Sequence, residues 1–536
     1  MDKHAFNNEI IEKGLDNTPF APQLIKAFNA LEKGDIRQVA AIAQDTLKSD
    51  NQVPQAHYLL ARVAIQTRQL DIALRGFIRA TELDPTVADY WAFLALVHSQ
   101  TGNMPAAEIS VKKALNLNSE KAHVLRPMAH VLSLLGQLEE ASGLLNKAVE
   151  KSPQAAIYHH ALAVNLLGLG DFQGAQRAIQ RAIELNPYYA ESRWILSSLI
   201  KAEDNGMANE LVLLMNTPNM PDIEKAYLGY AAGKLFEDTQ HWQQAFSAFE
   251  QGAAAKRRLL HYDRNEARRT FDTLRRVCTK DWLNNKTNVR HDATPIFIVG
   301  QPRTGTTLVD RIVSSHSQVH SAGESVQLAM SLRAMSGVRT KEFISAELIE
   351  KAKQVSAAEL ARSYLTGVDK VKGNTPYFID KFPMNFMLLG FIVKAFPNAR
   401  IIHVTRNPID TCFAVYKQLF EEVYPHSYDQ TEMAEHYVMY RQLMAHWHAV
   451  MPGKIIDIAY EDIVQDNHSS AQKLIKDLGL EWEDDCSAFE KNNTAVTTAS
   501  AVQVREKVHT SSVGRWKKYE QQLAPTLNIL QKAGVI

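Results

Sequence analysis

Apolar and polar positions in the first part of the chain follow a helical pattern that recurs every 34 residues. In each repeat, one position allows a turn, two alanines are small where helices approach closely, and a final residue ends the second helix. The positions are Gly34, Arg68, Gly102, Gly136 and Gly170; Ala73, Ala107, Ala141 and Ala175; Ala80, Ala114, Ala148 and Ala182; and Pro85, Ser119, Pro153 and Pro187. We therefore predict a series of stacked helix–turn–helix units.

From about residue 291 the pattern changes to short apolar runs that are typical of buried strands. The run at 295–300 (PIFIVG) leads into the loop 300–307 (GQPRTGTT), and a helical pattern follows from Leu308. A strand, loop and helix in this order direct backbone amides and a helix N-terminus at an anion. We expect this loop to hold a phosphate-containing donor.

The loop shares its glycine spacing with nucleoside-triphosphate loops but differs from them in charge. Four residues separate Gly300 from Gly305, yet Thr306 stands where an ATP- or GTP-hydrolysing loop needs lysine. The positive charge lies inside the loop, at Arg303. A nucleotide kinase or NTPase of related fold is therefore the disfavoured alternative.

Composition narrows the class of protein. The chain has 536 residues with 59 basic and 59 acidic side chains, so we expect more than one domain and no general nucleic-acid binder. Its three cysteines, Cys278, Cys412 and Cys486, fit neither a zinc site nor a disulfide framework.

No apolar run is long enough to span a bilayer, and the N-terminus lacks the features of a signal peptide. We expect a cytoplasmic protein without a membrane span; the sequence indicates no oligomeric state.

The repeats resemble the tetratricopeptide repeat family, most clearly at 134–153 (LLGQLEEASGLLNKAVEKSP) and 167–187 (LGLGDFQGAQRAIQRAIELNP). The resemblance implies an all-α solenoid, and we expect a groove of this solenoid to bind a protein or peptide. We predict the repeat array over residues 1–205 and a divergent helical repeat with a linker over 206–290. A further domain is predicted over 291–536.

Residues 256–276 (KRRLLHYDRNEARRTFDTLRR) form a strongly basic stretch. We interpret it as the solvated face of a linking helix, with Leu259, Leu260 and Phe271 on the opposite side. A contact with an acidic partner is the alternative.

Four segments of the second half resemble, in order, elements of the sulfotransferase family. These are 302–307 (PRTGTT) for the 5′-phosphosulfate loop, 398–412 (NARIIHVTRNPIDTC) for the 3′-phosphate element, 459–466 (AYEDIVQD) for the tyrosine-bearing segment and 511–520 (SSVGRWKKYE) for the closing Gly-x-Trp segment. The resemblance implies an α/β, P-loop-like domain with a parallel sheet. It also implies 3′-phosphoadenylyl sulfate (PAPS) as the donor, with no metal required.

The resemblance is closest to the tyrosylprotein sulfotransferase branch and to bacterial proteins that join tetratricopeptide repeats to such a domain. Glu324, in HSAGES at 320–325, matches the catalytic base of that branch, and Lys381, in IDKFPMN at 379–385, matches a lysine that contacts the bridging oxygen. A carboxylate near the acceptor hydroxyl can take its proton, while the lysine stabilises charge on the leaving oxygen. The branch suggests a protein tyrosine as the acceptor, with a glycan, lipid or small metabolite as alternatives.

The same resemblance implies the residues that contact the donor and the transition state. Arg303 contacts the 5′-phosphate and the sulfate, and Ser500 or Thr498 is the late transition-state hydroxyl. The predicted donor-binding residues are Arg303, Thr304, Gly305, Thr306, Thr307, Arg406, Tyr460 and Arg505.

Several of these residues have plain structural alternatives. Glu324 could cap a helix, Lys381 could form a surface ion pair with Asp380, and Arg406 could form a structural salt bridge. Tyr460 could be a core residue. Each alternative predicts different neighbours, so the tertiary structure can separate them.

The 3′-phosphate element departs from the family pattern at Ala414, where a serine is expected. The departure predicts either a weaker donor affinity or compensation by Thr411, and it motivates the alternative of an interaction scaffold with an inactive nucleotide-binding domain. His436, His446 and His448 are interpreted as surface and core residues, not as metal ligands.

Overall fold

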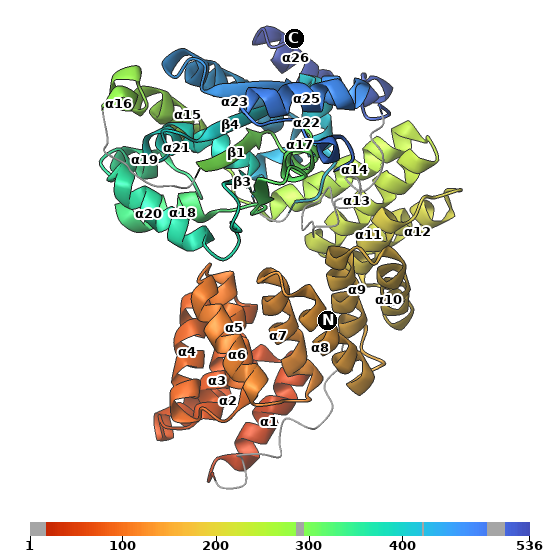
Figure 1. Ribbon diagram of the computed structural model, residues 1–536. Coiled ribbons are helices and arrows are strands. Elements are labelled where there is room, and N and C mark those ends of the chain that lie inside the picture. Colours follow the sequence, from red (N-terminus) through yellow and green to blue (C-terminus); the bar gives the residue numbers. More distant parts are fainter. Residues whose placement is uncertain (1–17, 286–293, 421–422, 490–509) are drawn as a thin grey trace. The chain divides into compact units, whose positions relative to one another are not determined.

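The computed structural model describes residues 18–285, 294–420, 423–489 and 510–536 (Figure 1). The chain divides into two compact units, residues 1–200 and 201–536. Every regular element in the described part of the first unit is a helix, and the second unit contains a parallel five-stranded sheet with helices around it. The predicted fold class, a helical solenoid followed by an α/β domain, is confirmed.

The first unit contains eleven described helices; α1 to α10 form five successive antiparallel pairs, and α11 follows them. They are α1 (Ala21–Glu32), α2 (Ile36–Ser49), α3 (Pro54–Gln66), α4 (Leu70–Leu83), α5 (Ala88–Gln100), α6 (Met104–Asn116), α7 (Ala122–Leu134), α8 (Leu138–Lys151), α9 (Ala156–Leu169), α10 (Phe172–Leu185) and α11 (Ala190–Leu199). The turns within pairs use the positions predicted from the repeat. Gly102 and Gly170 have φ angles of 77° and 82°, and Arg68 adopts the same left-handed conformation at 56°.

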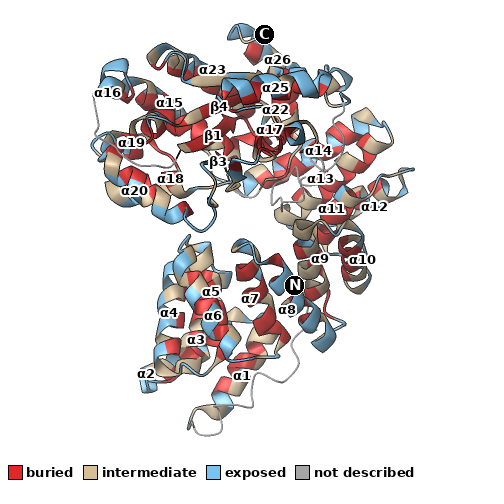
Figure 2. Cartoon of the chain, in the orientation of Figure 1, coloured by how far each residue is buried: buried red, intermediate tan, exposed pale blue. Residues whose placement is uncertain are grey.

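The repeated alanines form the contact surfaces between helices. Ala73, Ala107 and Ala141 are fully buried, as are Ala80 and Ala114 in the second register. Figure 2 shows the buried positions on the facing sides of neighbouring helices. Small side chains at these positions allow the close helix packing that the repeat predicts.

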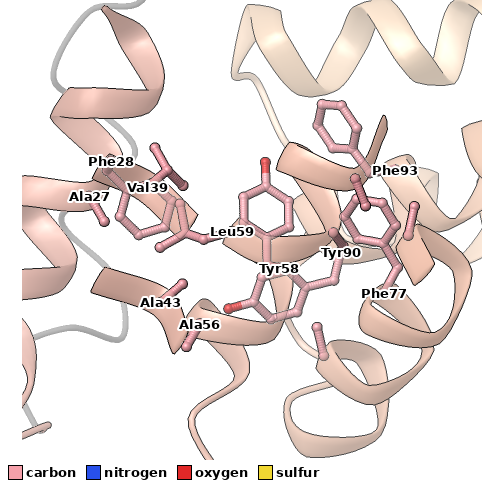
Figure 3. Close-up of a cluster of buried hydrophobic side chains, with 14 of the residues drawn as sticks. Ala27, Phe28, Val39, Ala43, Ala56, Tyr58, Leu59, Phe77, Tyr90 and Phe93 are labelled. Atoms are coloured by element: carbon pink, nitrogen blue, oxygen red, sulfur yellow. The ribbon is translucent and has the colours of Figure 1, made fainter. Parts of the chain in front are cut away.

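Aromatic side chains fill the wider spaces at the start of the array (Figure 3). Tyr58 lies at the centre of this cluster, with its ring centroid 5.3 Å from that of Tyr90 and 5.8 Å from those of Phe77 and Phe93. Offset and edge-to-face contacts of this kind stabilise a core beyond the area that they bury.

Five helices are described in the second unit before its first strand. They are α12 (Gly206–Met215), α13 (Asp222–Asp238), α14 (Trp242–Arg258), α15 (Arg264–Val277) and α16 (Lys280–Asn284). The sheet has the order β2-β3-β1-β4-β5, and all four strand pairings are parallel. The strands are β1 (Thr294–Gly300), β2 (Val319–Ser321), β3 (Tyr377–Lys381), β4 (Arg400–Thr405) and β5 (Ile455–Ala459).

Helices cover both faces of the sheet. Apolar residues of α17, α24 and α25 pack on one face, and α20, α21 and α23 pack on the other. The described helices after β1 are α17 (Thr306–Ser314), α18 (Gln327–Ser336), α19 (Ala346–Ala352), α20 (Ala357–Val368), η2 (Pro383–Leu388), α21 (Leu389–Ala395), α22 (Pro408–Tyr416), η3 (Pro425–Tyr428), α23 (Gln430–Val450), α24 (Tyr460–Gln465), α25 (Asn467–Asp477), η4 (Asp484–Ser487), η7 (Arg515–Tyr519) and α26 (Ala524–Lys532). β1 lies between β3 and β4, so the chain order reverses at its carboxyl end, where open α/β sheets bind ligands.

Helices α13 and α14 pack against the sheet-bearing part of the second unit. The Tyr230 hydroxyl donates a 2.9 Å hydrogen bond to the carbonyl of Tyr416, and the Phe246 ring stacks on the Tyr416 ring. The side chains of Tyr230 and Phe246 are both buried. The two helices are therefore part of the core of the second unit.

The basic stretch at 256–276 forms ion pairs within the second unit. Arg257 binds the Glu432 carboxylate at 2.7 and 2.9 Å, and Arg264 binds Glu435, both on α23. Phe271 is buried as predicted, but Leu259 is 49% exposed. The interpretation as a solvated face is therefore wrong for Leu259, which was expected on the opposite side, and incomplete for the partly buried Arg257, whereas Arg264 pairs with Glu435 and stays exposed.

Among the described residues, no helix combines the length and apolarity that crossing a bilayer requires.

Candidate active site

The predicted phosphate loop connects the carboxyl end of β1 to α17, and two glycines allow its path. A side chain at Gly300 would place Cβ 2.6 Å from the Val404 carbonyl oxygen of the neighbouring strand. A side chain at Gly305 would place Cβ 2.6 Å from Cδ2 of Tyr460, and the φ angle of 98° there favours glycine. The loop therefore lies directly against β4 and Tyr460.

Arg303 lies within this loop in a left-handed conformation, with a φ angle of 65°. Its carbonyl oxygen accepts a 2.9 Å hydrogen bond from Nη1 of Arg406. Burial, together with the charge of Arg406, lowers the pKa of Arg303 to about 10. Two neighbouring guanidinium groups in partly desolvated positions favour the binding of an anion.

Arg406 follows β4 and is held from three sides. Its guanidinium lies over the Tyr460 ring, 4.8 Å from the centroid, and its Nη2 donates a 2.6 Å hydrogen bond to the Ser512 carbonyl. Tyr460 in turn shares a 2.7 Å hydrogen bond between its hydroxyl and that of Ser512. The structure thus brings together Arg303, Arg406 and Tyr460. Arg406 has no acidic partner among the described residues, so the salt-bridge alternative does not describe it. Tyr460 also packs against the apolar core of the sheet, so its core alternative stays open.

Asp410, on the first turn of α22, fixes the closing segment above this site. Its carboxylate accepts hydrogen bonds from the backbone amides of Gly514 and Trp516, at 2.6 and 3.1 Å. Asp410 was not predicted from the sequence. An acid four residues after Arg406 was the only signal in the sequence, because its partners Gly514 and Trp516 lie about a hundred residues later.

Glu324 and Lys381 form an ion pair across the site, with 2.5 Å between Lys381 Nζ and Glu324 Oε1. Lys381 is 1% exposed, whereas the Glu324 side chain is 40% exposed. The pair therefore joins a buried ammonium to a carboxylate that solvent or an acceptor can reach.

The two structural alternatives for this pair are wrong. Asp380 does not form a surface pair with Lys381, because it is fully buried and accepts hydrogen bonds from Tyr364 and Asn385, at 2.7 and 3.1 Å. Glu324 does not cap α18, which begins at Gln327 without a side-chain cap.

Asp310 is a third ionisable residue near this pair, and sequence reasoning missed it. It lies on α17, is buried, and its Oδ1 has no hydrogen-bond partner among the described residues. Burial raises the pKa of Asp310, and the charge of Lys381 partly opposes that rise. An acid on the apolar helix that follows the loop was the available sequence signal.

The comparisons with known proteins identify both parts of the chain. Residues 295–484 match the family described as "Sulfotransferase family", and residues 58–122 and 160–199 match the family described as "Tetratricopeptide repeat". The chain joins tetratricopeptide repeats to a sulfotransferase-family domain. The resemblances predicted from the sequence, and the prediction of an enzyme domain of this family, are confirmed.

Curated relatives match the chain over part of their length. An uncharacterized protein of Aquifex aeolicus (strain VF5) is 31% identical over 332 residues, covering 60% of this chain and 43% of the relative. A protein-tyrosine sulfotransferase of Drosophila melanogaster is 27% identical over 202 residues, covering 35% and 38% respectively. The chain thus spans less than half the length of these two relatives. Among solved structures, the sulfotransferase domain from the curacin biosynthetic pathway covers 45% of this chain and 98% of that domain, at 14% identity and a TM-score of 0.31.

The remaining loop residues of the sulfotransferase domain lie at the N-terminus of α17. Thr304 donates a 2.8 Å hydrogen bond to the Gln301 carbonyl, and Thr306 and Thr307 are buried in the first turn of the helix. The buried Gln301 amide has no hydrogen-bond partner among the described residues. Ser500, Thr498 and Arg505 lie outside the described residues, so their predicted roles stay predictions.

Thr411 does not replace the hydroxyl that Ala414 lacks. Thr411 is fully buried and donates its hydrogen to the backbone carbonyl of Asn407 at 2.9 Å. The compensation predicted for this position is therefore wrong. Arg406 remains the cation of this element that lines a cavity.

That cavity, of about 780 Å³, lies at the carboxyl ends of β4 and β5. Arg406, Arg441 and Lys517 line it together with residues of the closing segment, including Gly514 and Trp516. Asp410, Asp457 and Glu461 line it as well, and each of these carboxylates already accepts a hydrogen bond from within the protein. The three cations can therefore still bind an anionic ligand.

The histidines of α23 lie in different environments. His436 stacks on His426 in the core, and His446 contacts the Cys278 carbonyl at 3.0 Å. His448 lies 3.3 Å from the Asp457 carboxylate, which also binds His403 at 2.6 Å. His403, His448 and Asp457 hold potential metal-ligand atoms within 4.8 Å of one another. This cluster could not be predicted from the sequence, because its members come from β4, α23 and β5. The Asp457 carboxylate already pairs with both imidazoles.

Proposed function

We propose that the sulfotransferase domain transfers a sulfuryl group from PAPS to a hydroxyl group of an acceptor. The observation that carries this proposal is the ion pair of Glu324 with the buried Lys381, next to a loop that contains Arg303. General-base chemistry needs an accessible carboxylate, and a leaving phosphate needs a fixed cation. Glu324 supplies the accessible carboxylate, and Lys381 supplies the fixed cation beside it.

The residues of the site fit the chemistry of the proposed donor. PAPS carries a phosphosulfate at one end and a phosphate at the other. The amides at the start of α17, with Arg303, suit the phosphosulfate, and the cavity lined by Arg406, Arg441 and Lys517 suits the 3′-phosphate. The amide of Gln301 and Nε of Arg406 are buried without partners among the described residues, and an anionic ligand would supply acceptors.

In the proposed mechanism Glu324 and Lys381 separate as the acceptor enters. The acceptor hydroxyl donates its hydrogen bond to Glu324, and Lys381 Nζ turns to the oxygen that bridges phosphorus and sulfur. The acceptor oxygen then forms a bond to sulfur while the bond from sulfur to the bridging oxygen breaks. The bonding electrons stay on the bridging oxygen, beside Lys381, and Glu324 holds the proton.

We further propose that the acceptor is a tyrosine side chain of a protein or peptide bound by the tetratricopeptide repeats. The support is that a Drosophila melanogaster relative of the domain is named protein-tyrosine sulfotransferase. The repeats of the first unit add an extended surface of the kind that binds peptides.

The test measures transfer of labelled sulfate from PAPS to a tyrosine-containing peptide. We expect Glu324→Gln to lower the rate by about 10²–10⁴-fold, as loss of a general base does. Lys381→Met should also lower the rate, because the leaving oxygen then lacks its cation. Glu347→Gln, which removes an exposed carboxylate on α19, is the matched control and should transfer at the wild-type rate.

Calorimetry with adenosine 3′,5′-bisphosphate, the desulfated product, separates binding from chemistry. Wild type and Glu324→Gln should bind it equally. A Glu324→Gln protein that transfers sulfate at the wild-type rate removes this residue from the mechanism. Absence of nucleotide binding at millimolar concentration would favour the scaffold alternative, and magnesium-dependent ATP turnover would favour the kinase alternative.

A further inference from the structure

Two imidazoles and a carboxylate, those of His403, His448 and Asp457, meet where α23 lies against β4 and β5. His403 and Asp457 are direct partners in the parallel pairing of these two strands. Nδ1 of His403 lies 2.6 Å from Oδ1 of Asp457, and Nε2 of His448 lies 3.3 Å from Oδ2 of the same carboxylate. The strand register and one helix thus bring both imidazoles to one carboxylate.

The spacing of these three groups suits a divalent transition metal. Imidazole nitrogen and carboxylate oxygen bind Zn²⁺ with bonds of about 2.0–2.2 Å, so two ligand atoms of a tetrahedral site are about 3.3 Å apart. His448 and Asp457 already have this separation. Nδ1 of His403 and Oδ1 of Asp457 must move apart by about 0.7 Å, and the Asp457 side chain, which is 48% exposed, is free to make this small shift.

Tyr440 fixes the imidazole of His403 from its other side. The Tyr440 hydroxyl is within hydrogen-bond distance of His403 Nε2, and both side chains are buried. When Nε2 donates its hydrogen to this hydroxyl, Nδ1 presents its lone pair to the space beside Asp457. Histidines that bind metals are oriented in this way, by a hydrogen bond from the ring nitrogen that does not bind the metal.

A metal ion can reach the cluster through the cavity of about 780 Å³, because all three residues line it. The His448 side chain is 40% exposed, so the ligands are not sealed inside the protein. Three protein ligands leave a fourth coordination position of Zn²⁺ for water or an anion. The cavity supplies the space for that fourth ligand.

The charges around the cavity allow a cation to bind. Its charged lining residues are Arg406, Arg441 and Lys517 on the positive side and Asp410, Asp457 and Glu461 on the negative side. Because these charges balance, the net field neither attracts nor repels a divalent ion strongly. The affinity then depends on the coordinate bonds that His403, His448 and Asp457 form.

We propose that His403, His448 and Asp457 bind a divalent transition-metal ion, with Zn²⁺ as the best fit. Mg²⁺ and Ca²⁺ fit less well, because they prefer oxygen ligands and two of the three groups are imidazoles. The sequence favoured a structural role for His448 because α23 by itself offers no suitable carboxylate, but β5 supplies one. The proposed sulfuryl-transfer steps use none of the three residues, so this site is an additional binding function of the domain.

Calorimetric titration of the full chain with ZnCl₂ tests this proposal, on protein prepared without a histidine tag. We expect one saturable site in the wild type. His448→Ala and Asp457→Asn should each weaken it by at least about 100-fold, because each removes a ligand. Tyr440→Phe removes only the group that positions His403 and should weaken it by about 10–100-fold.

A second measurement reports the ligands directly. Co²⁺ replaces Zn²⁺ in many sites, and its visible absorption depends on the coordinating atoms and their geometry. We expect Co²⁺ to gain an absorption band on binding to the wild type and to lose it in His448→Ala. Zn²⁺ should also raise the midpoint of thermal unfolding of the wild type, since an ion that binds only the folded state stabilises it.

Matched controls separate this site from general binding by surface histidines. His468→Ala removes an exposed imidazole from α25 and should bind Zn²⁺ as the wild type does. MgCl₂ should give no comparable site in the wild type. Circular dichroism shows whether each variant keeps its fold.

Three results would overturn the proposal. They are no saturable Zn²⁺ site up to about 1 mM, equal affinity of the wild type and the folded His448→Ala variant, and equal loss of affinity in His468→Ala and His448→Ala. Glu324→Gln should bind Zn²⁺ with wild-type affinity, so a failure of metal binding and a failure of sulfuryl transfer are distinguishable.

Discussion

Asp380 and Lys381 are neighbours in β3 that serve opposite sides of the sheet. Successive side chains of a strand point to opposite faces, so Lys381 reaches the site near α17 while Asp380 is buried against Tyr364 and Asn385. Burial raises the pKa of Asp380 to about 7, more than the hydrogen bonds to its carboxylate lower it. The same dipeptide thus holds one group for function and one for structure.

The raised pKa of Asp380 predicts a pH dependence of stability. The folded state binds this proton more tightly than the unfolded state, so the free energy of unfolding should fall as pH rises from about 4 to about 7, by at most about 1.4 kcal/mol per unit. Asp380→Asn should lose this part of the slope, as measured by urea unfolding across that range. Identical slopes for the variant and wild type would show that Asp380 titrates normally in the fold.

The sequence predicted both Glu324 and Lys381 as site residues but not the ion pair between them. The family resemblance pointed to Glu324 and Lys381 separately, and 57 residues separate them. Only the pairing of β2 with β3 brings them to one edge of the sheet. Asp310 and Asp410 were missed for the same reason, since a lone acid carries no signal until its neighbours are known.

Among the elements, α13 carries a buried carboxylate that joins several parts of the second unit. Glu237 binds Lys417 at 2.8 Å and Arg515 at 3.1 Å, and it accepts a 2.8 Å hydrogen bond from the Tyr519 hydroxyl. Burial acts to raise the pKa of Glu237, but the two cations and the hydrogen bonds lower it overall. One residue of α13 thereby fixes the end of α22 and η7, close to the closing segment of the site.

Glu237→Ala should destabilise the second unit by about 3 kcal/mol, because it leaves the partly buried Lys417 and Arg515 without their counter-charge. Glu250→Ala, on the exposed side of α14, is the matched control and should change little. Denaturant unfolding followed by tryptophan fluorescence measures both. A loss below about 1 kcal/mol for Glu237→Ala would mean that solvent replaces the carboxylate at low cost.

In the repeats, unlike in the candidate active site, most structural features could be predicted from the sequence. Their turns and helix contacts follow from local rules, so the positions of Gly102, Gly170 and the alanines were predictable one by one. The placement of residues 206–290 was less predictable. A divergent helix pair was recognisable, but the partner that it packs against was not.

At the scale of the whole molecule, the second unit extends from residue 201 to 536 and includes α12 to α16. The aromatic contacts of α13 and α14 and the ion pairs of α14 and α15 all reach residues beyond 380. These helices therefore cover apolar and charged surface that the sheet-bearing part cannot cover by itself.

A fragment of residues 201–536 should consequently fold and bind adenosine 3′,5′-bisphosphate, whereas a fragment of residues 291–536 should aggregate or lack cooperative unfolding. The reason is that removing α13 to α15 exposes buried rings such as Tyr416 and leaves Glu432 without its arginine. Gel filtration and thermal unfolding distinguish the two cases. A monomeric 291–536 fragment with the same melting temperature would show that these helices only accompany the domain.

The sequence by itself determined the repeat period, the two-part architecture, the loop at 300–307 and the residue types of the site. These depend on local periodicity, backbone conformation and contiguous motifs, which a linear sequence records directly. Only the tertiary structure decided that Lys381 faces Glu324 and not Asp380, and that Asp457 lies between two histidines. These features depend on which segments meet in space, and burial and charge act on a side chain only through the neighbours that folding provides.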